Sequence, residues 1–199
     1  KAVSKGKLTE ADMQAAYQRV RGVEDLDALA DCDLVIEAVI ENISLKRTIF
    51  KELDTVCKPE TILATNTSSL CITEIASVTC RPERVIGLHF FNPVMVMPLL
   101  EVIPGLLTSP KIVSFVQSFG EKIGKTVVVT KDRPGFIVNL LLIPFLMDAI
   151  NWLDSGLATK EDLDTAVRLG LNHPMGPLAL CDLIGLDTVL NIADAIQGE

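Results

Sequence analysis

The sequence predicts an α/β fold in which a doubly wound sheet is followed by an all-α C-terminal domain. Two observations support this prediction. Short apolar runs alternate with amphipathic stretches in residues 1–131, whereas residues 132–199 contain helical patterns only. Strands that are separated by helices favour parallel pairing with right-handed crossovers. The segment Lys131-Asp-Arg-Pro-Gly135 marks the expected boundary between the two domains.

The expected strands are short runs rich in apolar and β-branched residues. The first of them, residues 33–40, is almost continuously apolar, as is usual for a strand that is buried on both faces. The further expected strands cover residues 61–65, 84–90, 99–103 and 126–129.

Apolar residues at helical spacing predict the helices of both domains. In the first domain they cover residues 8–19, 44–56 and 111–123. Thr9 is a suitable N-cap for the first of these helices. In the second domain the expected helices cover residues 136–153, 160–169, 177–184 and 187–196.

The composition is that of a globular protein without a nucleic-acid partner. Of the 199 residues, 49% are hydrophobic and 22% are charged, and the net charge of −8 leaves no basic face to neutralise phosphates. The cysteines are odd in number and never spaced as C-x-x-C, which argues against a disulfide framework and a zinc site. We therefore expect no metal site and reduced thiols that act as small buried hydrophobic groups. The cysteines are Cys32, Cys57, Cys71, Cys80 and Cys181.

The most hydrophobic stretch, residues 136–153, is expected to be a buried core helix and not a membrane span. Asn139, Pro144 and Asp148 interrupt it, and its longest apolar run is far below the ~20 residues that cross a bilayer. The first residues of the chain are polar and do not resemble a secretory leader. We expect a cytoplasmic protein, or a protein of the mitochondrial matrix if a leader has been lost.

Polar residues occur where three of the expected strands end. Glu41 follows the first strand, the Asn-Thr-Ser-Ser segment of residues 66–69 follows the second, and His89 and Asn92 lie at the end of the third. Ligands of open parallel sheets bind beyond the carboxyl ends of the strands. The sequence therefore predicts a site at this edge that combines carboxylate, amide, hydroxyl and imidazole groups.

A further carboxylate, Glu101, lies inside the apolar run Leu-Leu-Glu-Val-Ile, where an unpaired charge would be costly. His89, on an adjacent strand, is the obvious partner. An imidazole that donates one N–H to a carboxylate keeps its other nitrogen free to accept a proton, which is the arrangement of a general base. Spacing alone leaves an equally good alternative, in which His89 is a satisfied strand-end histidine and Glu101 pairs with a lysine or an arginine.

Five ordered motifs resemble signature segments of the L-3-hydroxyacyl-CoA dehydrogenases, most closely the bacterial short-chain enzymes for 3-hydroxybutyryl-CoA. The motifs are Asn66-Thr-Ser-Ser-Leu70, Gly87-Leu-His-Phe-Phe-Asn-Pro93, Leu100-Glu-Val-Ile103, Pro134-Gly-Phe-Ile-Val-Asn139 and His173-Pro-Met-Gly-Pro177. The resemblance implies a Rossmann-type domain and an oxidoreductase that interconverts (S)-3-hydroxyacyl-CoA and 3-oxoacyl-CoA with NAD(H), in fatty-acid or butanoate metabolism. It also implies an acyl-CoA substrate and a homodimer formed through the C-terminal helical domain.

The resemblance implies catalytic roles for four residues. His89 matches the general base that takes the proton from the 3-hydroxyl group, and Glu101 matches the carboxylate that orients His89. Ser68 and Asn139 match residues that hydrogen-bond the substrate oxygens. Ser68 could instead cap the next helix, with the hydroxyl role passing to Ser69, and Asn139 could make a purely structural bond.

Further positions match the cofactor and CoA contacts of the family. Those around the ribose and nicotinamide of NAD are Glu41, Lys46, Ser68 and Asn92. Lys1 and Lys5 fall where a helical tail offers basic residues to the CoA phosphates. As alternatives, Glu41 and Lys46 could form a surface ion pair, and Lys1 and Lys5 could be solvated surface charges.

The chain also departs from the family pattern. It contains no G-x-G-x-x-G, the phosphate-binding turn that opens a dinucleotide-binding unit. We therefore expect an incomplete Rossmann-type domain, a helical domain that is incomplete at its C-terminal side, and weak NAD binding by these residues alone. Leu140 replaces the usual arginine after Asn139, and Met95 and Pro98 replace the usual proline and lysine.

Two other functions are compatible with the sequence. One is a dehydrogenase of the same fold that acts on a free hydroxy acid or sugar acid, and the other is a non-catalytic dimerisation module. Outside the site, His173 precedes Pro174 in a loop and is expected to be structural. Asp182 and Asp187 are expected to cap or bridge helices of the second domain.

Overall fold

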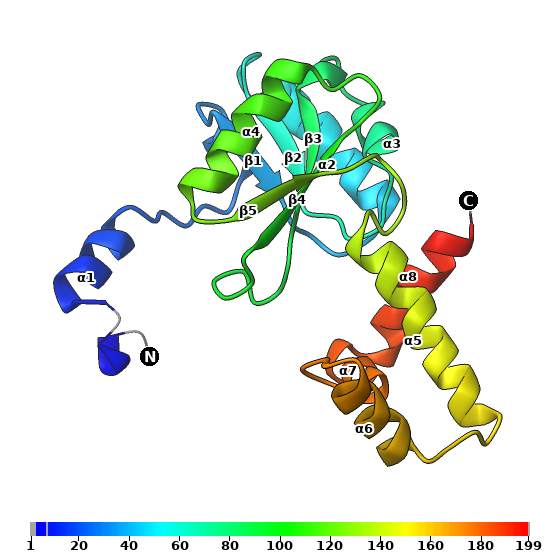
Figure 1. Ribbon diagram of the computed structural model, residues 1–199. Helices are drawn as coiled ribbons and strands as arrows, with labels where there is room; N and C mark the ends of the chain where they lie inside the picture. Colours follow the sequence, from blue (N-terminus) through cyan, green and yellow to red (C-terminus); the bar gives the residue numbers. More distant parts are fainter. Residues whose placement is uncertain (1–2, 7, 199) are drawn as a thin grey trace.

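The computed structural model describes residues 3–6 and 8–198 as a five-stranded sheet followed by a bundle of helices (Figure 1). The strands are β1 (Leu34–Glu37), β2 (Ile62–Thr65), β3 (Val85–Phe90), β4 (Leu99–Pro104) and β5 (Thr126–Val129), in the order β1-β2-β3-β4-β5. β1, β2 and β3 are parallel to one another, but β4 is antiparallel to β3 and parallel to β5. No helix separates β3 from β4, so the parallel pairing expected of strands that are separated by helices does not extend to this pair. Residues 91–98, which connect them, are too few for a parallel crossover, which needs about a dozen residues or more.

Helices cover both faces of the sheet, so the first domain has three layers (Figure 1). Its helices are α1 (Glu10–Gln18), α2 (Ile43–Val56), α3 (Ile72–Ala76) and α4 (Pro110–Lys122), with 3-10 turns η1 (Val3–Lys5), η2 (Leu26–Leu29) and η3 (Pro82–Arg84). Alternate residues of a strand point to opposite faces. Leu63 and Ile103 accordingly pack with α2 and α3, whereas Ala64 and Val102 pack with α4.

The first strand is shorter and less buried than the sequence suggested. β1 ends at Glu37, and the side chain of Ile36 is 37% exposed. In the described part of the chain β1 is an edge strand of the sheet. Helix α4 contacts β4 and β5, which lie towards the opposite edge. The expectation of a strand over residues 33–40 that is buried on both faces was therefore wrong.

The N-terminal segment, which contains η1 and α1, reaches away from the sheet (Figure 1). Thr9 is the N-cap of this helix, as expected, and its Oγ1 atom accepts the backbone N–H of Asp12 at 3.1 Å. No residue of α1 is buried. This helix is consequently a surface element whose side chains all contact solvent.

The helices of the second domain form a separate bundle below the sheet (Figure 1). They are α5 (Val138–Asp154), α6 (Lys160–Gly170), α7 (Pro177–Ile184) and α8 (Leu186–Gln197). Their common core contains Ile143, Leu146, Cys181, Val189 and Ala193. None of the helices in the described residues is long and apolar enough to cross a membrane.

Polar contacts join the helices of this bundle. Lys160 of α6 forms an ion pair of 2.7 Å with Asp182 of α7, which is the kind of bridge expected of Asp182. The ring of His173 packs edge-on against Phe145 of α5 with 5.7 Å between ring centroids, in keeping with a structural role.

The expectation that all the cysteines are buried was wrong for Cys80, which is exposed in the turn before η3.

Candidate active site

β3 and β4 bring His89 and Glu101 together. The two residues are direct partners in the antiparallel register, and directly opposed residues of such a pair point to the same face of the sheet. The Nδ1 atom of His89 lies 2.8 Å from the Oε2 atom of Glu101, and both side chains are buried. The alternative of a lysine or arginine partner for Glu101 was therefore wrong. Because a carboxylate only accepts, we assign the proton of this pair to Nδ1, which leaves Nε2 as the basic nitrogen.

The second oxygen of Glu101 holds the start of α5. Oε1 accepts the backbone N–H of Ile137 at 3.1 Å and that of Val138 at 3.0 Å. A helix N-terminus has unpaired N–H groups and a partial positive charge, so it stabilises an ionised carboxylate. One buried side chain thus binds the imidazole of His89 and the first helix of the second domain at the same time.

Asn139 continues this connection into the loop after β2. It lies in the first turn of α5, as predicted, and its Nδ2 atom donates to the carbonyl oxygen of Ser68 at 3.3 Å. The same loop is held from the other side by Glu41, whose Oε1 atom accepts the N–H groups of Ser68 at 2.9 Å and of Ser69 at 3.1 Å. The backbone of Ser68 is therefore fixed by both Asn139 and Glu41.

Lys46 is an interior residue and not part of a surface ion pair. Its side chain, from the first turn of α2, is fully buried. Its Nζ atom lies 2.7 Å from Oε1 of Glu37 and 3.5 Å from Oε2 of Glu41. The hydroxyl of Thr65 donates to the other oxygen of Glu37 at 2.7 Å. The ion pair between Lys46 and Glu41 is therefore present, but its expected surface location was wrong, because Lys46 is fully buried beside Glu37, which needs a counter-ion.

A cavity of about 570 Å³ lies between this loop and α8. Its lining consists of Val39, Glu41, Asn66, Ser68, Ser69 and Leu70 from the first domain and Thr188, Asn191, Ile192 and Ala195 from the second. Glu41 and Ser68 thus face one space at the carboxyl ends of β1 and β2. This is where the topology predicted a ligand.

The remaining predicted site residues lie apart from this cavity or outside the described residues. Asn92 is exposed just beyond β3, before the cis bond to Pro93. Lys1 lies outside the described residues, and only the backbone of Lys5 is described. Pro98 is compatible with the start of β4, because its carbonyl oxygen accepts the N–H of Thr126 at 2.8 Å.

Comparison with known proteins identifies the family. Residues 1–133 match the NAD-binding domain of the 3-hydroxyacyl-CoA dehydrogenases, and residues 135–199 match their C-terminal domain. The chain belongs to the 3-hydroxyacyl-CoA dehydrogenase family.

Named relatives agree with this assignment. The 3-hydroxybutyryl-CoA dehydrogenase of Clostridioides difficile is 50% identical over 199 residues, which are 100% of this chain and 71% of that protein. The human mitochondrial hydroxyacyl-coenzyme A dehydrogenase is 52% identical over 162 residues, 81% of this chain and 52% of that protein. The crystal structure of (S)-3-hydroxybutyryl-CoA dehydrogenase from Ralstonia eutropha superposes with a TM-score of 0.97 at 45% identity, covering 100% of this chain and 70% of that one.

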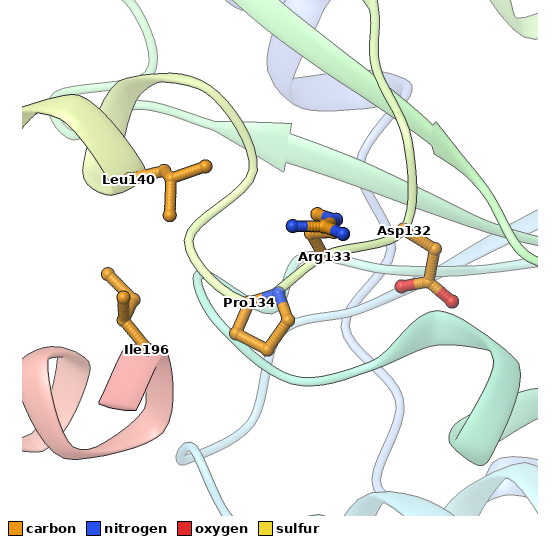
Figure 2. Close-up of a pocket in the computed structure, with 5 residues that line it drawn as sticks. All are labelled: Asp132, Arg133, Pro134, Leu140 and Ile196. Carbon is orange, nitrogen blue, oxygen red and sulfur yellow. The ribbon is translucent and has the colours of Figure 1, made fainter. Parts of the chain in front are cut away.

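Asp132 is a site neighbour that sequence reasoning missed in this dehydrogenase. Its carboxylate points to the start of α3 (Figure 2), where it accepts the N–H groups of Ile72 at 2.8 Å and Thr73 at 2.7 Å. The side chain of Asp132 therefore caps the N-terminus of α3 in place of a residue from the preceding loop. The alternative that Ser68 caps this helix was wrong. Burial, together with the nearby Asp132, raises the pKa of the Cys71 thiol.

Asp132 also borders a second cavity, of about 670 Å³, at the junction of the two domains (Figure 2). Its lining is Asp132, Arg133, Pro134, Leu140 and Ile196. Leu140 occupies the position where the family pattern has an arginine, so an apolar side chain faces the hollow in this dehydrogenase. The predicted residues Glu41 and Ser68 line the other cavity.

Two further residues were missed for different reasons. Glu37 lies in an apolar strand, which is the same signal that indicated Glu101, and its partner is the predicted site residue Lys46. Phe136 packs its ring against His89, with 5.5 Å between ring centroids. An apolar residue next to a glycine carries no sequence signal for such a contact.

Proposed function

We propose that this family member is an NAD-dependent oxidoreductase that interconverts (S)-3-hydroxyacyl-CoA and 3-oxoacyl-CoA, with 3-hydroxybutyryl-CoA as its substrate. The observation that carries the proposal is the buried pair of His89 and Glu101, which has the geometry of an oriented general base. The family supports the reaction class, and the names of the relatives support a four-carbon acyl group.

In the oxidative direction, Nε2 of His89 takes the proton from the 3-hydroxyl group of the substrate. NAD, when bound, supplies the acceptor for the hydride that leaves C3, so the alcohol loses a proton and a hydride and becomes a ketone. The imidazolium that forms is stabilised by the carboxylate of Glu101 at 2.8 Å. In the reductive direction the same imidazolium returns its proton to the developing alkoxide.

Ser68 and Asn139 are proposed to hold the substrate oxygens. One N–H of the Asn139 amide is engaged with the carbonyl oxygen of Ser68, so the amide keeps a second donor and its acceptor oxygen for a ligand. Ser68, which carries the proposed hydroxyl group, lines the cavity beside α8. Both residues are immobilised by backbone contacts, which favours their use as fixed hydrogen-bonding groups.

The residues at the ends of β1, β2 and β3 are proposed to bind the nicotinamide end of NAD. Glu41 suits this role because it lines the cavity and its side chain is 37% exposed. Lys46 is fully buried and paired twice, so it supports Glu41 and does not itself reach the ligand. Asn92 and the hydroxyl of Ser68 would complete the polar contacts, and Lys1 and Lys5 would bind the CoA phosphates.

We also propose that the enzyme is cytoplasmic and that it forms a homodimer through the second domain. Support for the dimer comes from large apolar side chains that are exposed on α5, α7 and α8. Examples are Leu141, Leu183 and Leu190. Exposed apolar surface of this kind is typical of a subunit interface. Sedimentation of wild type and of Leu183→Lys would test it, since a monomeric wild type would contradict the proposal.

The proposed activity is tested by the oxidation of NADH in the presence of acetoacetyl-CoA, with a sugar acid and NAD as the comparison reaction. His89→Gln should lower kcat roughly 10²–10⁴-fold, the usual contribution of a general acid or base. His173→Gln is the matched control, because it removes the other histidine of the chain and should leave kcat unchanged. Equal rates for wild type and His89→Gln would contradict the mechanism.

A further inference from the structure

The chain enters α5 through two successive residues with left-handed backbone conformations. Gly135 has φ of 79° and Phe136 has φ of 52°. Glycine adopts such angles readily, but a bulky aromatic residue does so rarely. Residues in sparsely populated backbone regions persist only where their surroundings hold them, and they cluster at functional sites. The conformation of Phe136 therefore requires an explanation.

The surroundings of Phe136 hold this conformation firmly. Its side chain is only 2% exposed and belongs to the core beneath α2 and α3. Its backbone N–H donates to the carbonyl oxygen of Arg133 at 2.9 Å, which closes the turn. Gly135 is equally constrained, because a Cβ atom there would lie 2.9 Å from Cδ1 of Ile196 and 3.1 Å from the backbone nitrogen of Leu140.

Two contacts lead from this turn to the catalytic pair. The ring of Phe136 packs against the imidazole of His89 at 5.5 Å between centroids and an interplanar angle of 59°. The two N–H groups that follow the turn, of Ile137 and Val138, both point at Oε1 of Glu101. Successive N–H groups in a turn form a concave site for an anion. The turn thus contacts both members of the His89–Glu101 pair.

We propose that Phe136 is a positioning residue for the reaction, acting through both members of the His89–Glu101 pair; the proposal rests on the function proposed above. Its ring limits the rotation of the imidazole, and its left-handed backbone aims the next two amides at the carboxylate. Neither effect requires Phe136 to touch the substrate. Rotation of the imidazole away from Glu101 would remove the hydrogen bond that keeps Nε2 basic.

Phe136→Leu tests the ring, because leucine keeps an apolar side chain in the core but removes the flat surface against His89. In the protein at its full natural length, kcat should fall about 10-fold or more, since small misplacements of a reacting group cost up to about 10²-fold. KM for acetoacetyl-CoA and NADH should stay within about 3-fold, because no binding contact is lost. Phe145→Leu is the matched control, since it removes a ring that packs on His173, and it should leave kcat unchanged.

A spectroscopic measurement separates this proposal from the proposed activity. The chain has two histidines, so in a His173→Gln background the proton NMR signal of the hydrogen-bonded Nδ1–H comes from His89 alone. Phe136→Leu should weaken or broaden that signal while near-UV circular dichroism shows a folded protein. Should Phe136→Leu fail to fold, Phe136→Met provides a flexible side chain that fills the same space.

Wild-type kcat in Phe136→Leu would overturn the proposal. It would also be overturned if kcat fell only in step with melting temperature while the Nδ1–H signal stayed intact, because that result indicates a purely structural residue. If the wild type itself oxidised no NADH, the proposed function would fail, but the NMR comparison would still decide whether Phe136 positions His89.

Discussion

The backbone N–H of Val138 donates to Oε1 of Glu101 across the boundary between the two domains, at a distance of 3.0 Å. The other oxygen of the same carboxylate binds His89. The orientation of the proposed general base is therefore coupled to the position of the first helix of the second domain. A change in how α5 meets the sheet would reach the imidazole through a single side chain.

Glu101→Gln is predicted to reduce both activity and stability. The glutamine amide has only one acceptor oxygen, so it cannot serve His89 and the two amides of α5 together. We expect kcat to fall on the order of 10²-fold. The free energy of unfolding should fall by about 1–3 kcal/mol, the cost of leaving buried donors unpaired. NADH oxidation and urea unfolding measure the two effects.

The control for this substitution is Glu121→Gln on the exposed side of α4, which should change neither quantity. A stable but inactive Glu101→Gln would show that the α5 contact contributes little. A protein that kept wild-type kcat would contradict the proposed role of Glu101.

Lys46→Met is predicted to be strongly destabilising. The substitution leaves the buried carboxylate of Glu37 without its counter-ion at 2.7 Å and weakens the support of Glu41. Breaking a buried ion pair by removing one partner typically costs about 3–5 kcal/mol. Urea unfolding monitored by circular dichroism checks the value.

Arg47→Met is the matched control, one residue further along α2. Its ion pair with Glu74 is exposed on both sides, so the loss should be about 0–1 kcal/mol. If the two substitutions lowered the free energy of unfolding equally, the interior ion pair would contribute no more to stability than the exposed one.

The cysteines are predicted to differ in reactivity. Burial raises the pKa of the Cys57 and Cys181 thiols above the ordinary value of 9.0, so their thiolate fraction at about pH 8 is small. Iodoacetamide should label the exposed Cys80 first, as followed by mass spectrometry of digested samples. Labelling in urea, where burial is lost, is the control, and equally fast labelling of Cys57 in the folded protein would contradict the prediction.

The same raised pKa values predict how stability depends on pH. The folded-state pKa of these thiols lies above the unfolded value, so the unfolded state loses its thiol protons first as the pH rises. The stabilisation is complete below the unfolded value of 9.0 and is lost as the pH rises through the folded-state pKa. The urea midpoint of Cys57→Ala with Cys181→Ala should therefore decline less with pH in this range than that of the wild type.

Gly176→Ala is predicted to destabilise the second domain. Asp164 accepts the N–H groups of Leu178 and Ala179 at the start of α7, and a Cβ atom on Gly176 would lie 2.4 Å from its carboxyl group. Displacing this cap should cost about 1–3 kcal/mol. Gly170→Ala is the control, because a Cβ there meets open space at the end of α6, and it should stabilise by about 0.5–1 kcal/mol. A neutral Gly176→Ala would show that Asp164 is not needed as a cap.

Local patterns in the sequence were sufficient to identify most helices and strands. α7 and β5 have the bounds that were expected, because each depends on its own residues. A proline and a preceding glycine define the start of α7, and a β-branched run defines β5. The choice of His89 and Glu101 was also local in origin, since a carboxylate in an apolar strand requires a partner. The family motifs then favoured one partner over the other.

Tertiary structure decided the contacts that depend on how distant segments meet. Only the antiparallel register places His89 opposite Glu101, and a slip of one residue would turn one of the two side chains to the other face of the sheet. The burial of Lys46 depended on where α2 packs on β1, and the cap on α3 came from Asp132, far along the chain. No short-range periodicity in the sequence predicts such contacts. The sequence therefore indicated which groups needed partners, and only the packing of the elements decided which partners they received.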